Sequence, residues 1–125
     1  MPWTVRSLQP EFPCVEMVVS GTVTHEDSAE MRRATKDLML REGLSWVLYD
    51  ATDLVHVPTS TDIIEVAESM AVTNLPDGFR NAHVRPRDLS AAMWTDHWVA
   101  AANNRGICTG VFRTREEAIA WLLGE

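Results

Sequence analysis

The sequence predicts an α/β fold with a mixed, mostly parallel sheet of four or five strands flanked by helices. The first observation behind this expectation is the stretch 46–50, where four large apolar residues follow one another without alternation and stop at Asp50. Such a run is typical of a strand that is covered on both faces. The second is that helical spacings separate the strand candidates, which predicts the order β-β-α-β-α-β-α-β-α and parallel pairing of most neighbours.

The first two strands are expected to form an antiparallel hairpin. Residues 3–8 and 14–23 are joined by a short segment with two prolines, which favours a turn. In the second strand, Val15, Met17 and Val19 fall on one face at a period of two residues, with Glu16 on the other face. The later strands are expected at residues 46–50, 79–85 and 107–112.

The first helix has the clearest boundaries. Thr24 and Asp27 form a capping box at its start, and Gly43 ends it. One stripe of this helix is expected to face the core and the opposite side to contact water. The stripe consists of Met31, Ala34, Thr35 and Leu38, and the solvent side of Arg32, Arg33, Lys36 and Asp37.

Three further helices complete the expected order. The second begins between residues 59 and 62, the third spans Leu89–Asn104, and a capping box of Thr114 and Glu117 starts the last. The second helix has an apolar stripe of Ile63, Val66, Ala67 and Met70, and the last packs Ala118, Ile119, Trp121 and Leu122 inward.

Composition and charge exclude several classes of protein. Eleven basic residues against eighteen acidic residues give a net charge of −7, which argues against nucleic acid as a partner and against adhesion to anionic lipid. No apolar run approaches the ~20 residues of a membrane span, and the N-terminus does not read as a signal peptide. We therefore expect a cytoplasmic protein without integral membrane association, with one domain over residues 1–125.

Metal and cofactor chemistry finds little support in the residue spacings. Cys14 and Cys108 lie far apart without metal-binding spacing, and both are expected to be buried free thiols. The histidines show no HxxxH or HxH pattern, and no phosphate-binding glycine motif or nucleophile elbow occurs. We expect no cofactor, no metal and no catalytic residues.

The element order and several local strings together resemble the STAS-type fold and, within it, the SpoIIAA-like family of small proteins. The strings are Gly-Thr-Val-Thr at 21–24, Val-Leu-Tyr-Asp at 47–50 and the closing stretch 104–122, which contains RGI and VFRTREEAIAWL. The resemblance covers nearly the whole chain, and the closing stretch is its most specific part. It implies a regulatory or ligand-binding role rather than catalysis, and interaction with a protein partner.

The resemblance also points to the loop after the central strand. In anti-anti-sigma members of the family this loop carries an Asp-Ser-Ser-Gly string whose serine is phosphorylated by the partner kinase. At the corresponding place this chain has Pro58-Thr59-Ser60-Thr61, so the hydroxyls match at Thr59 and Ser60 while the acid and the glycine are replaced. A phosphate there would be favoured by the start of the second helix, whereas the simpler alternative is that one hydroxyl caps this helix.

Two carboxylates lie at the end of the central strand. Asp50 and Asp53 are three residues apart and could share a metal or a proton, but no third ligand is spaced nearby. The alternative is that one of them turns the chain through an Asx-type hydrogen bond. Asp50, Asp53, Thr59, Ser60 and Thr61 are thus the candidate residues of a regulatory loop.

A second candidate region is the apolar side of the third helix. Trp94 and Trp98 stand four residues apart, with Met93 and Val99 beside them, and one helix face cannot bury all four. Core packing is one interpretation, and a homodimer interface or the lining of an apolar pocket are the others. SpoIIAA-like proteins also resemble CRAL-TRIO lipid-binding domains, which favours an apolar ligand such as a lipid as the alternative function. That alternative predicts a cavity of at least ~300 Å³ between the second and third helices, lined by Met70, Met93, Trp94 and Trp98.

Overall fold

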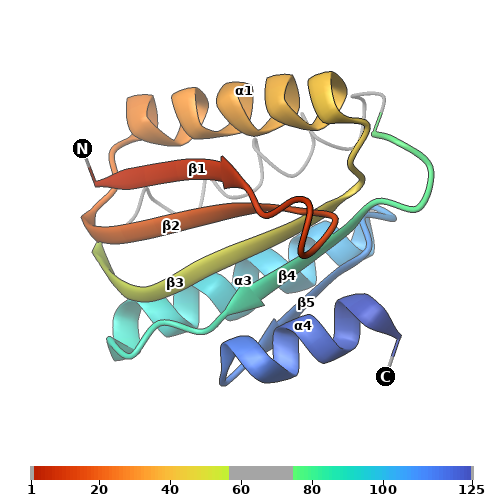
Figure 1. The fold of residues 1–125 in the computed structure, drawn as a ribbon. Coiled ribbons are helices and arrows are strands. Elements are labelled where there is room, and N and C mark those ends of the chain that lie inside the picture. The colour runs from red at the N-terminus through yellow and green to blue at the C-terminus, as the bar shows by residue number, and fades with distance from the viewer. Residues whose placement is uncertain (1, 57–74, 125) are drawn as a thin grey trace.

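The structure is a computed structural model that describes residues 2–56 and 75–124 (Figure 1). Its elements follow the expected order, and the expected second helix, with its stripe from Ile63 to Met70, lies outside the described residues. The elements are β1 (Trp3–Ser7), β2 (Cys14–Thr22), α1 (His25–Glu42), β3 (Trp46–His56), β4 (Arg80–Val84), α3 (Leu89–Asn104), β5 (Thr109–Phe112) and α4 (Arg115–Leu123).

The five strands lie side by side in the order in which the chain makes them, β1-β2-β3-β4-β5. The edge strand β1 pairs with β2 antiparallel, and the pairs β2–β3, β3–β4 and β4–β5 are parallel. The predicted fold class, a mixed and mostly parallel α/β sheet with an initial hairpin, is therefore confirmed.

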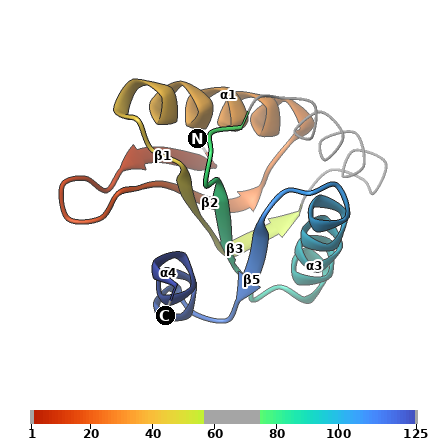
Figure 2. The same ribbon diagram turned by 90° about the vertical axis from the view of Figure 1, so that its right-hand side faces the viewer.

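Helices cover both faces of this sheet (Figure 2). The crossovers β2-α1-β3 and β4-α3-β5 advance across the sheet in the same direction, so right-handed connections place α1 and α3 on the same face. Contacts of two paired strand residues agree with this placement. Tyr49 of β3 packs in the cluster beneath α1, and His83, its partner in β4 on the same face, contacts Trp98 of α3. The helix α4 packs on the opposite face of the sheet.

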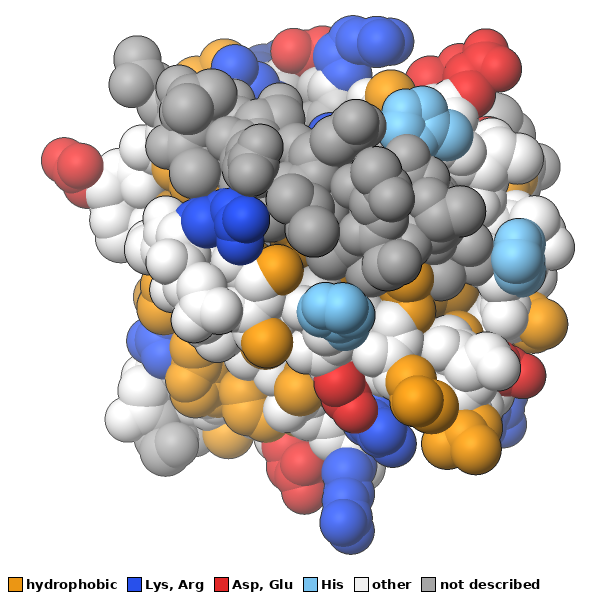
Figure 3. Space-filling view, turned by 180° about the vertical axis from the view of Figure 1, so that it is seen from behind, with side chains coloured by type: hydrophobic (Ala, Val, Ile, Leu, Met, Phe, Trp, Pro, Cys, Tyr) orange, Lys and Arg blue, Asp and Glu red, His pale blue; other side chains and the backbone are white. Residues whose placement is uncertain are grey.

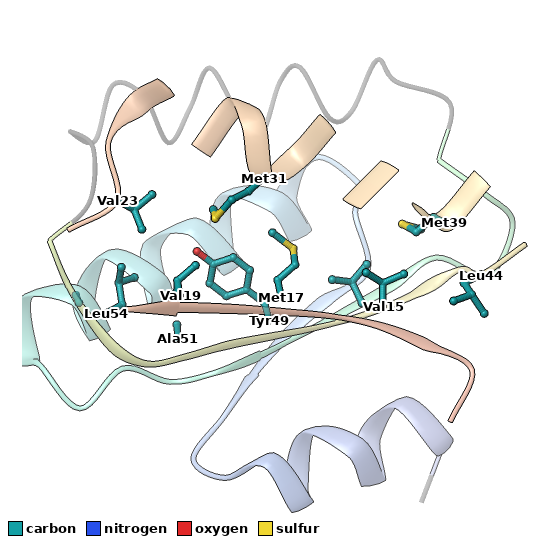
Figure 4. Packing of buried hydrophobic residues seen from close by; sticks show 12 residues of the cluster. Val15, Met17, Val19, Val23, Met31, Met39, Leu44, Tyr49, Ala51 and Leu54 are labelled. Carbon is teal, nitrogen blue, oxygen red and sulfur yellow. The ribbon is translucent and has the colours of Figure 1, made fainter. Parts of the chain in front are cut away.

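The core beneath α1 is the largest apolar cluster among the described residues. Figure 4 shows side chains of β2 and β3, among them Met17 and Tyr49, rising from the sheet toward Met31 and Met39 of α1. The period-two prediction for β2 is confirmed, since Val15, Met17 and Val19 are all buried in this cluster. On the other face, α4 buries Ala118 and Leu122 against Cys14, Leu48, Ala82 and Val84.

The predicted helix caps are present. Thr24 Oγ1 accepts a hydrogen bond from the amide of Asp27 (3.0 Å), and the Asp27 carboxylate accepts one from the amide of Thr24 (3.0 Å). Thr114 Oγ1 accepts from the amide of Glu117 (3.1 Å), but the Glu117 carboxylate accepts from the amide of Arg113 (3.2 Å), so only the first half of this predicted box is present. Gly43 ends α1 at φ 66°, a left-handed conformation that other residues adopt only at a cost.

Two expectations about the strands are wrong. The central strand does not stop at Asp50 but continues as β3 to His56, pairing with β2 beyond an irregularity in register, because Leu54 is fully buried and holds this part of the chain against the core. Cys108 is exposed rather than buried, because β5 begins only at Thr109 and the cysteine lies in the segment before it. Cys14 is buried as expected, and burial raises the pKa of its thiol to about 12.

Candidate functional site

The structure holds a cavity of about 560 Å³ near the amino-terminal ends of β3 and β4, a volume in the range of small-molecule sites. Its wall is formed by α1, by the start of β3 and by residues 75–81, which lead into β4. We call it the α1 cavity. The inner part of its lining is apolar. It consists of Met39 of α1, Leu44 of the turn after this helix, Val47 of β3 and Phe79, which precedes β4.

Two polar atoms are buried in the same wall. Thr35 Oγ1 and Asn81 Oδ1 have no hydrogen-bond partner among the described residues, although each of these residues is only 7% exposed. Leaving a buried polar atom unpaired costs about 1–3 kcal/mol, so most such atoms in folded proteins have a partner. A ligand or an ordered water with a complementary group would remove this cost.

The mouth of the α1 cavity carries basic side chains. Arg32, Arg33 and Lys36 of α1 line it, and Arg32 is half-buried, with its Nε donating to the carbonyl of Ser28 (3.3 Å). Burial lowers the pKa of the Arg32 guanidinium because it disfavours the charged form. The prediction that Arg32 lies on a water-facing side of the helix is therefore wrong, whereas Arg33 and Lys36 are exposed.

Asp50, where the sequence analysis expects the central strand to end, belongs to an ion-pair network on the α4 face of the sheet. Arg115, the first residue of α4, donates from Nη2 to Glu16 of β2 (2.7 Å) and from Nη1 to Asp50 (3.2 Å). The Glu16 side chain is only 4% exposed, and its other oxygen accepts from Nε of Arg6 (2.7 Å). A buried carboxylate of this kind is tolerated because two guanidinium groups neutralise and hydrogen-bond it.

The two candidate aspartates do not form a pair. Asp50 Oδ1 accepts hydrogen bonds from the amide (3.1 Å) and the hydroxyl (2.6 Å) of Thr52, which is the Asx-type turn considered for this position. Asp53 forms an ion pair with Arg87 at the surface. Thr59, Ser60 and Thr61 lie outside the described residues, and in the described part of the chain no group of three His, Cys, Asp or Glu residues could hold a metal ion.

The tryptophan-bearing helix divides its large side chains between core and solvent. Trp98 is buried and Trp94 is half-buried. Met93 and Leu89 are exposed, at 63% and 70%. In the view from behind, hydrophobic side chains reach the surface in the lower half, where α3 runs (Figure 3). Met93, Trp94 and Trp98 do not line the α1 cavity, and Met70 lies outside the described residues.

A buried histidine connects α3 to the sheet. Trp98 Nε1 donates to His83 Nε2 (3.0 Å), so His83 is neutral with its proton on Nδ1, which is itself buried without a partner in the described part of the chain. The His83 ring also packs against Tyr49, with ring centroids 4.8 Å apart. Burial lowers the pKa of His83 to about 3 and raises that of Tyr49.

The sequence analysis did not predict the ion-pair network of Arg115, but one residue could have indicated it. Glu16 lies in the middle of an apolar strand, and a carboxylate there requires a cationic partner. Which arginine pairs with it depends on the return of α4 to the sheet. The α1 cavity had no comparable signal, because its wall combines a helix with a connecting segment.

Two of the solved structures that match this chain do so over nearly its whole length. One is an uncharacterised protein of the DUF3478 family with a SpoIIAA-like fold from Shewanella loihica PV-4, which is 18% identical with a TM-score of 0.59, covering 96% of this chain and 91% of that chain. The other is the anti-sigma factor antagonist SpoIIAA in its unphosphorylated form, 16% identical with a TM-score of 0.59, covering 98% of this chain and 99% of that chain.

These matches define the class of the protein by its fold. The chain has a SpoIIAA-like α/β fold, as the resemblance of its sequence to this family implied. No family model and no curated protein matches the sequence. Among the described residues, no helix is both long and apolar enough to cross a membrane.

Arg115→Gln tests the ion-pair network. Since this change leaves the buried carboxylate of Glu16 with one guanidinium fewer, we expect the free energy of unfolding to fall by about 3 kcal/mol. Urea unfolding followed by circular dichroism measures this fall. Arg87→Gln removes an arginine from the exposed pair with Asp53 and serves as the control, with an expected change of less than about 1 kcal/mol. Equal losses in the two variants would contradict a structural role for the network.

The low pKa of His83 predicts that acid destabilises the protein. Below pH 6.5 the unfolded chain binds a proton at this imidazole, while the folded chain does not until about pH 3, so stability is lost as the pH falls through this window. The expected contribution is roughly 1.4 kcal/mol per pH unit. His83→Gln keeps an acceptor for Trp98. Between pH 6 and 4, the free energy of unfolding of this variant, measured by urea, should fall less steeply by about this amount. A variant with the same slope as the parent protein would refute the assignment.

Proposed function

We propose that this chain is a cytoplasmic, non-catalytic regulatory module that binds a small ligand in the α1 cavity and thereby adjusts its interaction with a protein partner. The observation that carries the proposal is the cavity itself, which combines an apolar depth with the unpaired polar atoms of Thr35 and Asn81. The two cysteines are free, which is typical of proteins from a reducing compartment.

The state of the titratable groups supports a role without catalysis. The Cys14 thiol has a pKa of about 12 and stays protonated, so it is a poor nucleophile. His83 is buried with a pKa of about 3, far from the value that suits a general base near neutral pH. Glu16 and Asp50 are both engaged by Arg115. These groups are committed to the fold.

The fold supports the regulatory part of the proposal. One structure that this chain resembles is that of an anti-sigma factor antagonist, a protein that acts on other proteins. The loop of Thr59, Ser60 and Thr61, which follows β3, stays our prediction for the partner-facing segment. Self-association through α3 also stays a prediction, with Leu89 and Met93 as its exposed apolar side chains.

Native mass spectrometry of the protein, purified gently from its own host, tests the ligand. We expect a bound organic molecule in the parent protein and its loss from Ala29→Trp, because Ala29 lines the cavity and the indole would fill it. Ala100→Trp, which adds the same side chain at an exposed position of α3, is the matched control and should keep the molecule. A bare parent protein, or equal retention by both variants, would count against the proposal. The same spectra report the number of subunits.

A further inference from the structure

The charges of α1 are segregated with respect to the α1 cavity. The helix has four basic residues, and three of them, Arg32, Arg33 and Lys36, line the cavity, whereas Arg41 does not. None of the acidic residues of α1 lines it. They are Glu26, Asp27, Glu30, Asp37 and Glu42. The described lining contains one carboxylate, that of Asp77.

Helical spacing explains this arrangement. Each of the residues 29, 32, 33, 36, 40 and 43 stands three or four positions from another member of the set, so together they form one side of the helix. Acidic residues at the ends of α1 have other functions: Asp27 caps the helix, and Glu42 accepts a hydrogen bond from the hydroxyl of Ser7 (2.9 Å). The cavity mouth is therefore positive on a chain whose net charge is −7.

The basic residues at the mouth are not neutralised within the described part of the chain. No carboxylate there lies within ion-pair distance of Arg32, Arg33 or Lys36. Arg32 is half-buried, and its Nε donates a hydrogen bond to the backbone carbonyl of Ser28. A partly buried guanidinium is stabilised strongly by an oxyanion, which it can bind through two parallel hydrogen bonds.

We propose that the α1 cavity selects an amphipathic organic anion, with its carboxylate or phosphate head at Arg32, Arg33 and Lys36. The apolar body of the ligand lies on Met39, Val47 and Phe79. A polar group along this body satisfies the buried atoms of Thr35 and Asn81. This assignment rests on the proposed function, since it names the class of ligand that the regulatory module binds.

Isothermal titration calorimetry with four eight-carbon probes tests the selectivity for anions. The probes are octanoate, octyl phosphate, octanol and octylammonium, which share an apolar chain and differ in the head group. Because an anionic head group accepts charge-assisted hydrogen bonds, at least one anion should bind roughly tenfold tighter than octanol, and octylammonium should bind weakest. The ratio between octanoate and octyl phosphate identifies the preferred head group.

Variants of α1 locate the site of the head group. Arg32→Gln should weaken binding of the preferred anion roughly tenfold and leave octanol unchanged. Arg41→Gln removes the same charge from the same helix outside the cavity, and we expect less than about a twofold change. Lys36→Gln, at an exposed position, is the second test in case Arg32→Gln unfolds, which the urea midpoint reports.

Three outcomes would overturn the assignment. They are binding of octanol as tight as that of the anions, an equal loss in Arg41→Gln and in Arg32→Gln or Lys36→Gln, and no binding of the anions at millimolar concentration. Tight binding of octanol that Ala29→Trp abolishes would remove the selectivity for anions while keeping the cavity as a ligand site. The failure of this inference is therefore distinguishable from the failure of the proposed function.

Discussion

The attachment of α4 depends on one arginine. Arg115 stands at the start of this helix, where the helix dipole disfavours a positive charge, and it is stabilised there by Glu16 and Asp50 from two neighbouring strands. The contact orients α4 so that Ala118 and Leu122 cover the apolar face of the sheet. In this way a buried carboxylate in β2 specifies where the last helix of the chain packs.

The same topology separates two regions with different chemistry. The ion-pair network lies on the α4 face, with Glu16 near the start of β2 and Asp50 in the middle of β3. The α1 cavity lies on the opposite face, near the amino-terminal ends of β3 and β4. The strand β3 connects them, since Val47 lines the cavity and Asp50 belongs to the network. The two regions therefore share a single strand of the sheet and use its opposite faces.

Local patterns in the sequence predicted more of the fold than of the candidate site. The capping box of Thr24 and the period-two face of β2 depend on residues close in sequence, and both are confirmed. The extension of β3 depends on pairing with β2, and the partner of Glu16 lies at the far end of the chain, so no local spacing revealed either. The interpretation of Arg32 as solvent-facing failed because it considered the helix alone, whereas this side chain lies half-buried at the α1 cavity.

The order of the strands has a consequence for how the chain folds. Because each strand pairs with its neighbour in sequence, the sheet closes through one short hairpin and single crossover segments, none of which spans the whole chain. The contact of Arg115 with Glu16 instead closes a loop of nearly the whole chain, so we expect α4 to dock after the folding transition state. Losing this contact would then accelerate unfolding and leave the folding rate almost unchanged.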